Sequence, residues 1–138
     1  QNINLKNIVI PGLIKIMSAS IGNPHCIILV KKLNSINLNV LGPKLVKHKY
    51  FPDQANITFV EKINEKNIKV LFWERGGGHT LACGSGTCAT AFVLFHNNIV
   101  KSEIKIKTEQ SKLETIIKQN TVSLKGPAEL VYQSTIKV

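Results

Sequence analysis

Residues 73–90 bring an acid, a cysteine and five glycines into one stretch, WERGGGHTLACGSGTCAT. Cys83 stands just before a predicted helix, whose unpaired amides and positive dipole end stabilise a thiolate and can hold a carboxylate. Glu74 precedes the glycine turn, so we expect it to return to the same loop. A nearby carboxylate disfavours a thiolate, so Glu74 suits the role of a hydrogen-bond partner that holds the proton in transit. The stretch predicts a thiol site for proton transfer.

The glycines of this stretch allow left-handed backbone angles and a close approach to a ligand. They do not form a nucleotide loop, because neither Gly-x-x-x-x-Gly-Lys-Ser/Thr nor Gly-x-Gly-x-x-Gly opens the helix. Arg75 is the sole arginine of the chain. Its guanidinium is suited to bind a carboxylate of a ligand through two hydrogen bonds. The alternative is a structural salt bridge with a nearby acidic residue.

The other two cysteines are predicted to lie away from this site. Cys88 comes five residues after Cys83, so helix geometry turns it roughly 140° around and about 7.5 Å along the axis, which predicts a core position. Cys26 follows His25 in a strand, where successive side chains point to opposite faces, so only one of the two can reach the site. The remaining histidines have no spacing typical of metal ligands, and we expect no metal: His48, His79 and His96.

The composition limits the class of protein. At 138 residues the chain fits one domain, and its 18 Lys and Arg outnumber 8 Asp and Glu. The lysines are scattered and lack clustered Arg with interleaved aromatics, which argues against a nucleic-acid partner. Three cysteines without a Cys-x-x-Cys motif favour a reducing compartment. The uncharged residues 76–100 are interrupted by Gly, Asn and His and are not expected to span a membrane.

The hydrophobic pattern predicts an α+β fold. Residues 85–96 are apolar all round, which is typical of a fully buried helix. Residues 38–47 have weaker helical spacing, and Gly42-Pro43 should lie at the start of that helix or break it. We expect a mostly antiparallel, curled, barrel-like sheet around the one central helix. The predicted strands are residues 13–18, 26–31, 55–62, 68–74, 103–107, 113–118, 121–125 and 129–137.

Four segments together resemble the C-terminal half of the diaminopimelate epimerase family: residues 22–26 (GNPHC), 51–60 (FPDQANITFV), 74–88 and 126–131 (GPAELV). The resemblance implies an epimerase that interconverts LL- and meso-diaminopimelate in lysine and peptidoglycan precursor biosynthesis, without pyridoxal phosphate, metal or another cofactor. Family members have two similar domains that each supply one catalytic cysteine to a cleft. Residues 1–138 are thus expected to be the single C-terminal domain, without the N-terminal domain.

The resemblance also implies roles for individual residues. Cys83 corresponds to the second catalytic thiol, Glu74 to its acid, which also binds substrate, and His25 to the histidine that supports the other thiol. The substrate-binding residues are the amides of Gly84 and Ser85 for the α-carboxylate, and Asn23, Asn56 and Arg75 for the distal end.

Inversion of a stereocentre needs a second acid on the opposite face, so we expect the isolated chain to be inactive. The family suggests a cytoplasmic homodimer whose partner is the small substrate, not nucleic acid or a membrane. Two alternatives stay open. One is another isomerase of this architecture, such as a proline racemase relative or a phenazine-biosynthesis-type isomerase, and the other is a non-catalytic module that binds anionic ligands through the +10 charge.

Overall fold

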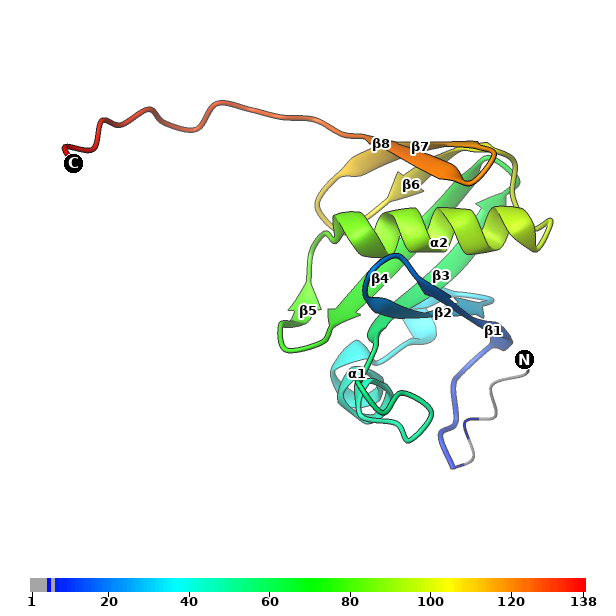
Figure 1. Cartoon of the computed structure of the whole chain (residues 1–138). Helices are drawn as coiled ribbons and strands as arrows, with labels where there is room; N and C mark the ends of the chain where they lie inside the picture. Colours follow the sequence, from blue (N-terminus) through cyan, green and yellow to red (C-terminus); the bar gives the residue numbers. More distant parts are fainter. Residues whose placement is uncertain (1–4, 6) are drawn as a thin grey trace.

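The computed structural model describes residue 5 and residues 7–138. One eight-stranded sheet has the order β1-β2-β3-β4-β6-β7-β8, and β5 pairs with β4. The helix α2 lies inside the curl of this sheet, and α1 lies outside it (Figure 1). The elements are β1 (Leu13–Ser20), β2 (Pro24–Val30), the short 3-10 helix η1 (Leu33–Ser35), α1 (Leu38–Val46), β3 (Asn56–Asn64), β4 (Asn67–Glu74), β5 (Gly78–Thr80), α2 (Gly84–His96), β6 (Glu103–Lys107), β7 (Lys112–Lys118) and β8 (Thr121–Lys125).

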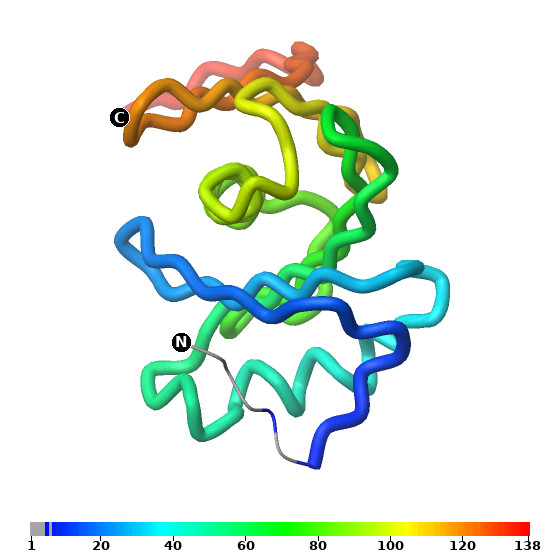
Figure 2. Tube along the Cα trace, turned by 90° about the vertical axis from the view of Figure 1, so that its right-hand side faces the viewer, coloured from blue at the N-terminus to red at the C-terminus, as the bar shows by residue number. Residues whose placement is uncertain are grey.

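The sheet curls around α2 like a letter C (Figure 2). Its pairs β2–β3 and β4–β6 are parallel, and the others are antiparallel. The predicted α+β class, a mostly antiparallel curled sheet around a helix, is confirmed. No described helix combines the length and the apolar content that a membrane crossing requires.

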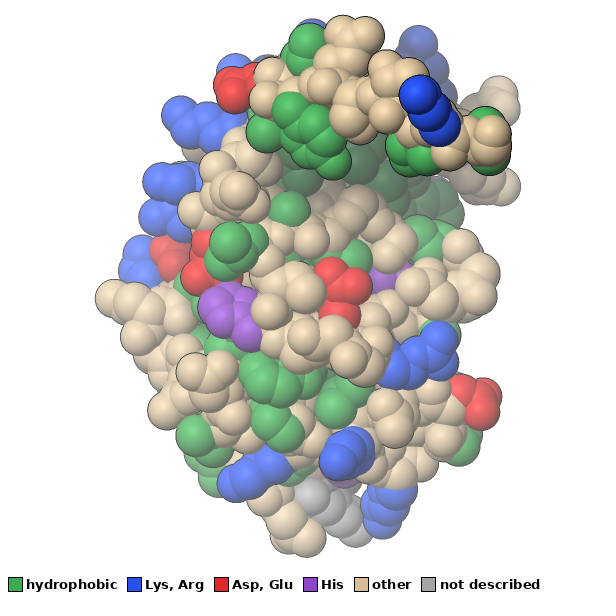
Figure 3. All heavy atoms as spheres, turned by 90° about the vertical axis from the view of Figure 1, so that its left-hand side faces the viewer, with side chains coloured by type: hydrophobic (Ala, Val, Ile, Leu, Met, Phe, Trp, Pro, Cys, Tyr) green, Lys and Arg blue, Asp and Glu red, His purple; other side chains and the backbone are tan. Residues whose placement is uncertain are grey.

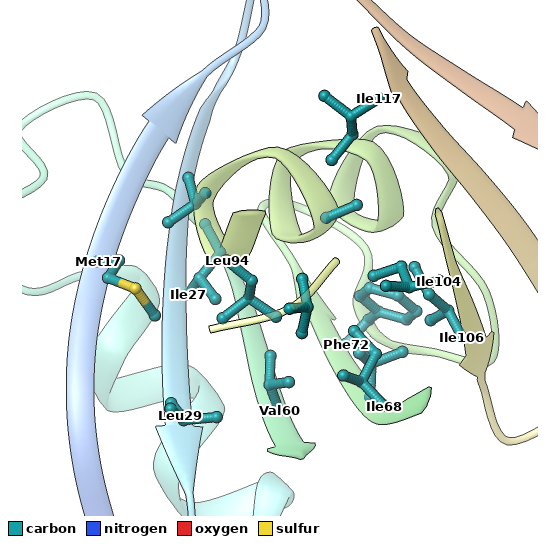
Figure 4. Packing of buried hydrophobic residues seen from close by; sticks show 14 of the residues in the cluster. Met17, Ile27, Leu29, Val60, Ile68, Phe72, Leu94, Ile104, Ile106 and Ile117 are labelled. Atoms are coloured by element: carbon teal, nitrogen blue, oxygen red, sulfur yellow. The ribbon is translucent and has the colours of Figure 1, made fainter. Parts of the chain in front are cut away.

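The first hydrophobic core fills the space between the concave face of the sheet and α2. Leu94 of α2 is fully buried there, together with Ile27, Val60, Phe72 and Ile106 from four different strands (Figure 4). These strands present alternate residues to the helix, because the side chains of a strand point to opposite faces in turn. This packing fixes the start of α2 relative to the end of β4.

The prediction that α2 is buried on every side is wrong along one face. The sheet edges β1 and β8 do not pair with each other, and α2 lies open between them (Figure 1). A groove of about 900 Å³ follows this opening and is lined by Cys88, Phe92 and His96 of the helix. Cys88 is therefore half-buried and not a core residue, because none of the described strands covers its side of the helix.

A second core holds α1 against the outer side of β2 and β3. The Asn37 side chain caps the helix by accepting a hydrogen bond from the Val40 amide. The expectation that Gly42-Pro43 begins or breaks this helix is wrong, because α1 continues through both residues. The buried leucines of α1 hold it on the sheet, and Gly42 leaves room for the Trp73 ring, which lies 2.3 Å from where a Cβ would be.

The strand predicted at residues 129–137 is absent. Residues 126–138 have no regular secondary structure and extend away from the rest of the chain (Figure 1). A strand requires the amides and carbonyls of a neighbour, and no described strand lies beside this segment. We call residues 126–138 the C-terminal arm.

Candidate active site

Three neighbouring strands bring the first group of site residues to one edge of the sheet. His25 at the start of β2 is in register with Asn56 at the start of β3, since these strands are parallel. Ile57 is in register with Trp73 across the antiparallel pair β3–β4. Glu74, the last residue of β4, consequently lies at the same edge. Residues that are 49 positions apart along the chain become neighbours through this register.

The hairpin from β4 to β5 holds the Glu74 carboxylate. Thr80 Oγ1 donates a hydrogen bond of 2.7 Å to Glu74 Oε1. Gly76 and Gly78 turn the chain with φ angles of 79° and 73°, which glycine adopts without strain. The sequence analysis missed Thr80. The signal was its position six residues after Glu74 across a three-glycine turn, a spacing that suits cross-strand neighbours.

Cys83 is the N-cap residue of α2, as its predicted place before the helix required. Its Sγ accepts a hydrogen bond of 3.3 Å from the Gly86 amide and lies 3.5 Å from Ser85 Oγ. The carbonyl oxygen of Cys83 accepts a hydrogen bond of 2.7 Å from the Thr87 hydroxyl, which further fixes the N-cap residue on the helix. One amide donor and the N-terminal end of the helix thus lie directly at this sulfur.

The first turn of α2 also presents amides that no helical carbonyl can reach. The first N–H groups of any helix have no partner within it. Gly84 is exposed and Ser85 is half-buried, and both directly follow the thiol residue. An anion placed on these two amides would lie beside the Cys83 sulfur.

His25 is a buried histidine at the start of β2. Its side chain is 1% exposed, and burial lowers its pKa below the ordinary value of 6.5, against an opposing charge effect of Glu74. Nε2 lies 3.1 Å from Asn23 Oδ1, and because an amide oxygen only accepts, this nitrogen carries the hydrogen. Nδ1 is buried and has no partner among the described residues. Glu74 is therefore near enough for its negative charge to act on the His25 ring.

Asn56 and Arg75 form a connected pair beside Glu74. The Arg75 amide donates to Asn56 Oδ1 at 2.9 Å, and Arg75 Nη1 donates to the Asp53 carbonyl at 2.7 Å. The alternative of a structural salt bridge for Arg75 finds no support, since no ion pair of this residue occurs within residues 7–138. The guanidinium is exposed and retains further donors.

Cys26 lies away from the site, as its place next to His25 in a strand predicted. That thiol is 0% exposed and belongs to the second core, and burial raises its pKa to about 12.

Cys83 and Glu74, which were predicted to share a hydrogen bond, do not contact each other directly in this structure. Among the described residues the acid bonds to Thr80, and the thiol bonds to the first turn of α2.

The candidate site residues lie outside the 900 Å³ groove, and three of them, Cys83, His25 and Asn56, are buried. The 900 Å³ groove is lined by parts of β1, α2 and the start of β8, and it includes none of Cys83, Glu74 and His25. Figure 3 views the face that carries β5 and the start of α2, where His and acidic side chains lie among uncharged surface. His79 Nε2 lies within hydrogen-bond distance of Glu109 Oε2. No cluster of three metal-binding side chains occurs in the described part of the chain.

The sequence is similar to that of known proteins over most of its length. The sequence model for diaminopimelate epimerase matches residues 17–131. The chain is 35% identical to a diaminopimelate epimerase of Methanococcus aeolicus over 99% of its own length and 48% of that protein, and 37% identical to one of Pelagibacter ubique over 88% and 45%. It thus spans about half the length of these relatives.

Solved structures share the fold. A phenazine biosynthesis protein of the PhzF family from Enterococcus faecalis superposes with a TM-score of 0.59 at 20% identity, over 73% of this chain and 36% of that one. A putative PhzC/PhzF protein from Clostridium difficile gives a TM-score of 0.58 at 20% identity, over 78% and 40%. The identity is low, so these structures support the architecture alone. The family, in contrast, is shown by the sequence model that matches residues 17–131: the chain belongs to the diaminopimelate epimerase family.

Proposed function

We propose that this chain is the C-terminal domain of an enzyme that interconverts LL- and meso-diaminopimelate, and that Cys83 is one of its two catalytic thiols. The observation that carries the proposal is the position of Cys83 at the N-cap of α2, beside free amides of the first helical turn. The family match and the named relatives support an epimerase.

The helix start suits the chemistry of an α-carbon. Removal of its proton creates negative charge that spreads into the α-carboxylate, and fixed amide donors lower the free energy of that state. The amides of Gly84 and Ser85 bind this carboxylate and thereby hold the α-carbon within reach of Cys83 Sγ. The residues of this chain supply a base and a carboxylate site without a cofactor.

The reaction needs two thiols on opposite faces of the α-carbon. One thiolate takes the proton as the C–H bond breaks, and the other thiol gives its proton to the opposite face, so that one S–H bond forms while another breaks. Cys83 acts as base for one stereoisomer and as acid for the other. Glu74, held by Thr80, exchanges the proton of Cys83 once substrate occupies the site.

The second thiol comes from an N-terminal domain that lies outside residues 1–138. His25 supports that thiol. Its Nε2 is covered by Asn23 in the structure described here. Asn23 also belongs to the proposed grip on the distal end of the substrate, and His25 Nδ1, which has no partner among the described residues, is the nitrogen available to the thiol.

Asn56 and Arg75 complete the grip on the distal end. The backbone amide of Arg75 orients the Asn56 side chain, and the Asp53 carbonyl orients the guanidinium. A planar guanidinium binds a carboxylate through two parallel hydrogen bonds, which suits a substrate with a second charged end. The free cysteines of this chain favour a reducing compartment such as the cytoplasm for the complete enzyme, and the family resemblance favours a homodimer.

The test uses the complete two-domain protein and its Cys83→Ala variant. Proton NMR in D2O follows both loss of the α-proton signal and conversion of LL-diaminopimelate to the meso form. The variant should lose inversion by at least about 1,000-fold, whereas Cys88→Ala, on the same helix but facing the groove, should retain it. Residues 1–138 alone should not invert the substrate.

Three results would reject the proposal. Near-normal inversion by Cys83→Ala would remove this residue from catalysis. Turnover by residues 1–138 alone would remove the need for a second domain. Inversion of proline in preference to diaminopimelate would assign the chain to another isomerase of the same architecture.

A further inference from the structure

The strand β5, which carries Thr80, lies beside a gap in the sheet. β5 pairs with the end of β4, whereas β6 pairs with its beginning. The other edge of β4 is occupied by β3 almost along its whole length, so β5 and β6 lie one after the other on the same edge. Val70 and Leu71 of β4 lie between the two paired stretches. The β4–β5 hairpin thus ends without a continuous strand beside it.

One side-chain contact crosses this gap. His79, the middle residue of β5, has its Nε2 within hydrogen-bond distance of Oε2 of Glu109, which lies 30 positions later in the turn after β6. An ionised carboxylate only accepts, so Nε2 carries the hydrogen. Within the described part of the chain, the other side-chain hydrogen bond of β5 is the one from Thr80 to Glu74. The contact with Glu109 therefore joins β5 to a part of the sheet beyond β4.

Glu109 belongs to a turn whose backbone is held in place. The preceding residue, Thr108, is 3% exposed, and its amide donates to the Ser111 carbonyl at 2.9 Å. Thr108 Oγ1 accepts from the Ser111 amide at 2.9 Å and from the Gln110 amide at 3.3 Å. The strands β6 and β7 on either side of the turn pair with each other. The Glu109 carboxylate is thus attached to a fixed backbone, and β5 is the part that the contact restrains.

The restraint on His79 reaches the Glu74 carboxylate through the backbone of β5. Thr80, the next residue, donates the hydrogen bond of 2.7 Å to Glu74 Oε1. Adjacent side chains of a strand point to opposite faces, so His79 points away from the face that carries Thr80. β5 pairs with β4 over three residues and follows a glycine turn, so its backbone has few other restraints. A second contact limits how far Thr80 can move from Glu74.

We propose that His79 and Glu109 are a positioning pair, which fixes β5 and so keeps the Thr80 hydroxyl on the Glu74 carboxylate. The proposal rests on the proposed epimerase function, in which Glu74 exchanges the proton of Cys83. The side chains of the pair are 36% and 35% exposed, so the pair adds little to the stability of the whole domain and acts locally.

The pair should affect turnover and not substrate affinity. The proposed substrate-binding groups of Asn56 and Arg75 are held by other contacts, with each other and with the Asp53 carbonyl. Loss of the pair leaves those contacts in place and loosens the acid alone. The expected change is therefore in kcat.

A double-mutant cycle in the complete enzyme tests this proposal. His79→Ala and Glu109→Ala should each lower kcat by about three- to tenfold and leave KM within about twofold, since a partly exposed charged hydrogen bond contributes modestly. The double variant should lose no more than either single variant, because two residues that act as one unit are not additive. His79→Gln, which keeps an N–H donor, should retain at least about half of the wild-type kcat.

Hydrogen–deuterium exchange of the same variants measures the restraint without reference to activity. Amides of β5 should exchange about three- to tenfold faster in His79→Ala and in Glu109→Ala, and those of β3 should be unchanged. The matched control is Glu65→Ala, which removes an exposed ion pair of 3.2 Å with Lys101 at the other end of β4. This variant should leave both kcat and the exchange of β5 as in the wild type.

Four results would count against the proposal or its basis. Wild-type kcat in both single variants would show that the pair does not position the acid. Losses that multiply in the double variant would show that the two residues act separately. A lowered kcat with unchanged exchange of β5 would assign the loss to another cause. A wild-type enzyme without epimerase activity would reject the proposed function, whereas faster exchange of β5 in the variants would still show the restraint, so the two failures are distinguishable.

Discussion

Thr80 Oγ1 lies 2.7 Å from Oε1 of Glu74 and donates a hydrogen bond to it. The two residues are joined by a glycine turn and belong to the paired strands β4 and β5. This contact holds one oxygen of the Glu74 carboxylate. The orientation of Glu74 therefore depends on a hydroxyl group that is not itself at the thiol.

Replacement of Thr80 by Val should lower the turnover of the complete enzyme by about 10- to 100-fold. A positioned acid or base contributes roughly 10²- to 10⁴-fold to a rate, and loss of its orientation removes only part of that contribution. Val keeps the shape of Thr but cannot donate, so the Glu74 carboxylate loses its fixed orientation. Thr80→Ser should restore most of the rate. Steady-state kinetics measure the effect, and equal rates for Val and wild type would contradict this role.

Gly42→Ala should destabilise the domain by about 1–3 kcal/mol, because the new methyl group overlaps the Trp73 ring and forces α1 or the ring to move. This cost exceeds the roughly 1 kcal/mol that alanine gains over glycine in a helix. Urea unfolding followed by the fluorescence of Trp73, the sole tryptophan, measures both stability and ring environment.

Gly84→Ala is the matched control for stability. The nearest neighbour of its added Cβ is Leu124 Cδ2 at 3.7 Å, which is an ordinary contact. Unfolding midpoints that differ little between Gly42→Ala and wild type would show that α1 adjusts without cost.

The stability of the protein should decrease as the pH falls below 6.5, in part because of His25. Burial lowers the pKa of this side chain in the folded state, so the unfolded chain takes up a proton first. Stability rises with pH wherever the unfolded state binds more protons, by at most about 1.4 kcal/mol per pH unit for one group. The contribution is complete above 6.5 and is lost toward the lower folded pKa.

Urea unfolding at pH 7.5 and 5.5 measures this dependence, and His25→Gln should make it shallower. A His25→Gln profile parallel to that of wild type would show that the ring is not held neutral by the fold.

Cys26 should resist alkylation in the folded protein. Its thiol is 0% exposed and burial raises its pKa to about 12, so almost no thiolate is present or accessible at pH 8. Burial also raises the pKa of Cys88, but this thiol lines the groove, so mass spectrometry after brief iodoacetamide treatment should find it modified faster than Cys26. Both should react in urea. Modification of native Cys26 at the rate of a free thiol would contradict its burial.

Much of the site could be predicted from the sequence because its signals are local. A cysteine before a run of small residues at a helix start indicates an N-cap, and Cys83 occupies that position. Alternation in a strand separates His25 from Cys26, and the structure assigns them to different environments. Strands and the central helix likewise follow from periodicity, which depends on neighbours along the chain.

Only the tertiary structure decided which distant residues meet. The register of β2, β3 and β4 places His25, Asn56 and Glu74 at one edge, and the β4–β5 hairpin selects Thr80 as the partner of Glu74. Pairing between strands depends on contacts that are remote in sequence, so no local pattern encodes it.

Dependence on remote contacts also explains two wrong predictions, the complete burial of α2 and the strand at residues 129–137. The apolar pattern of α2 predicted a helix covered on every side, and the alternation of residues 129–137 predicted a strand. Both patterns are correct in type, but each requires a neighbour that the described chain does not supply. Composition and period determined what these segments are suited to bury, and the tertiary structure decided that one helix face and the C-terminal arm stay open, because burial and strand pairing need a partner surface.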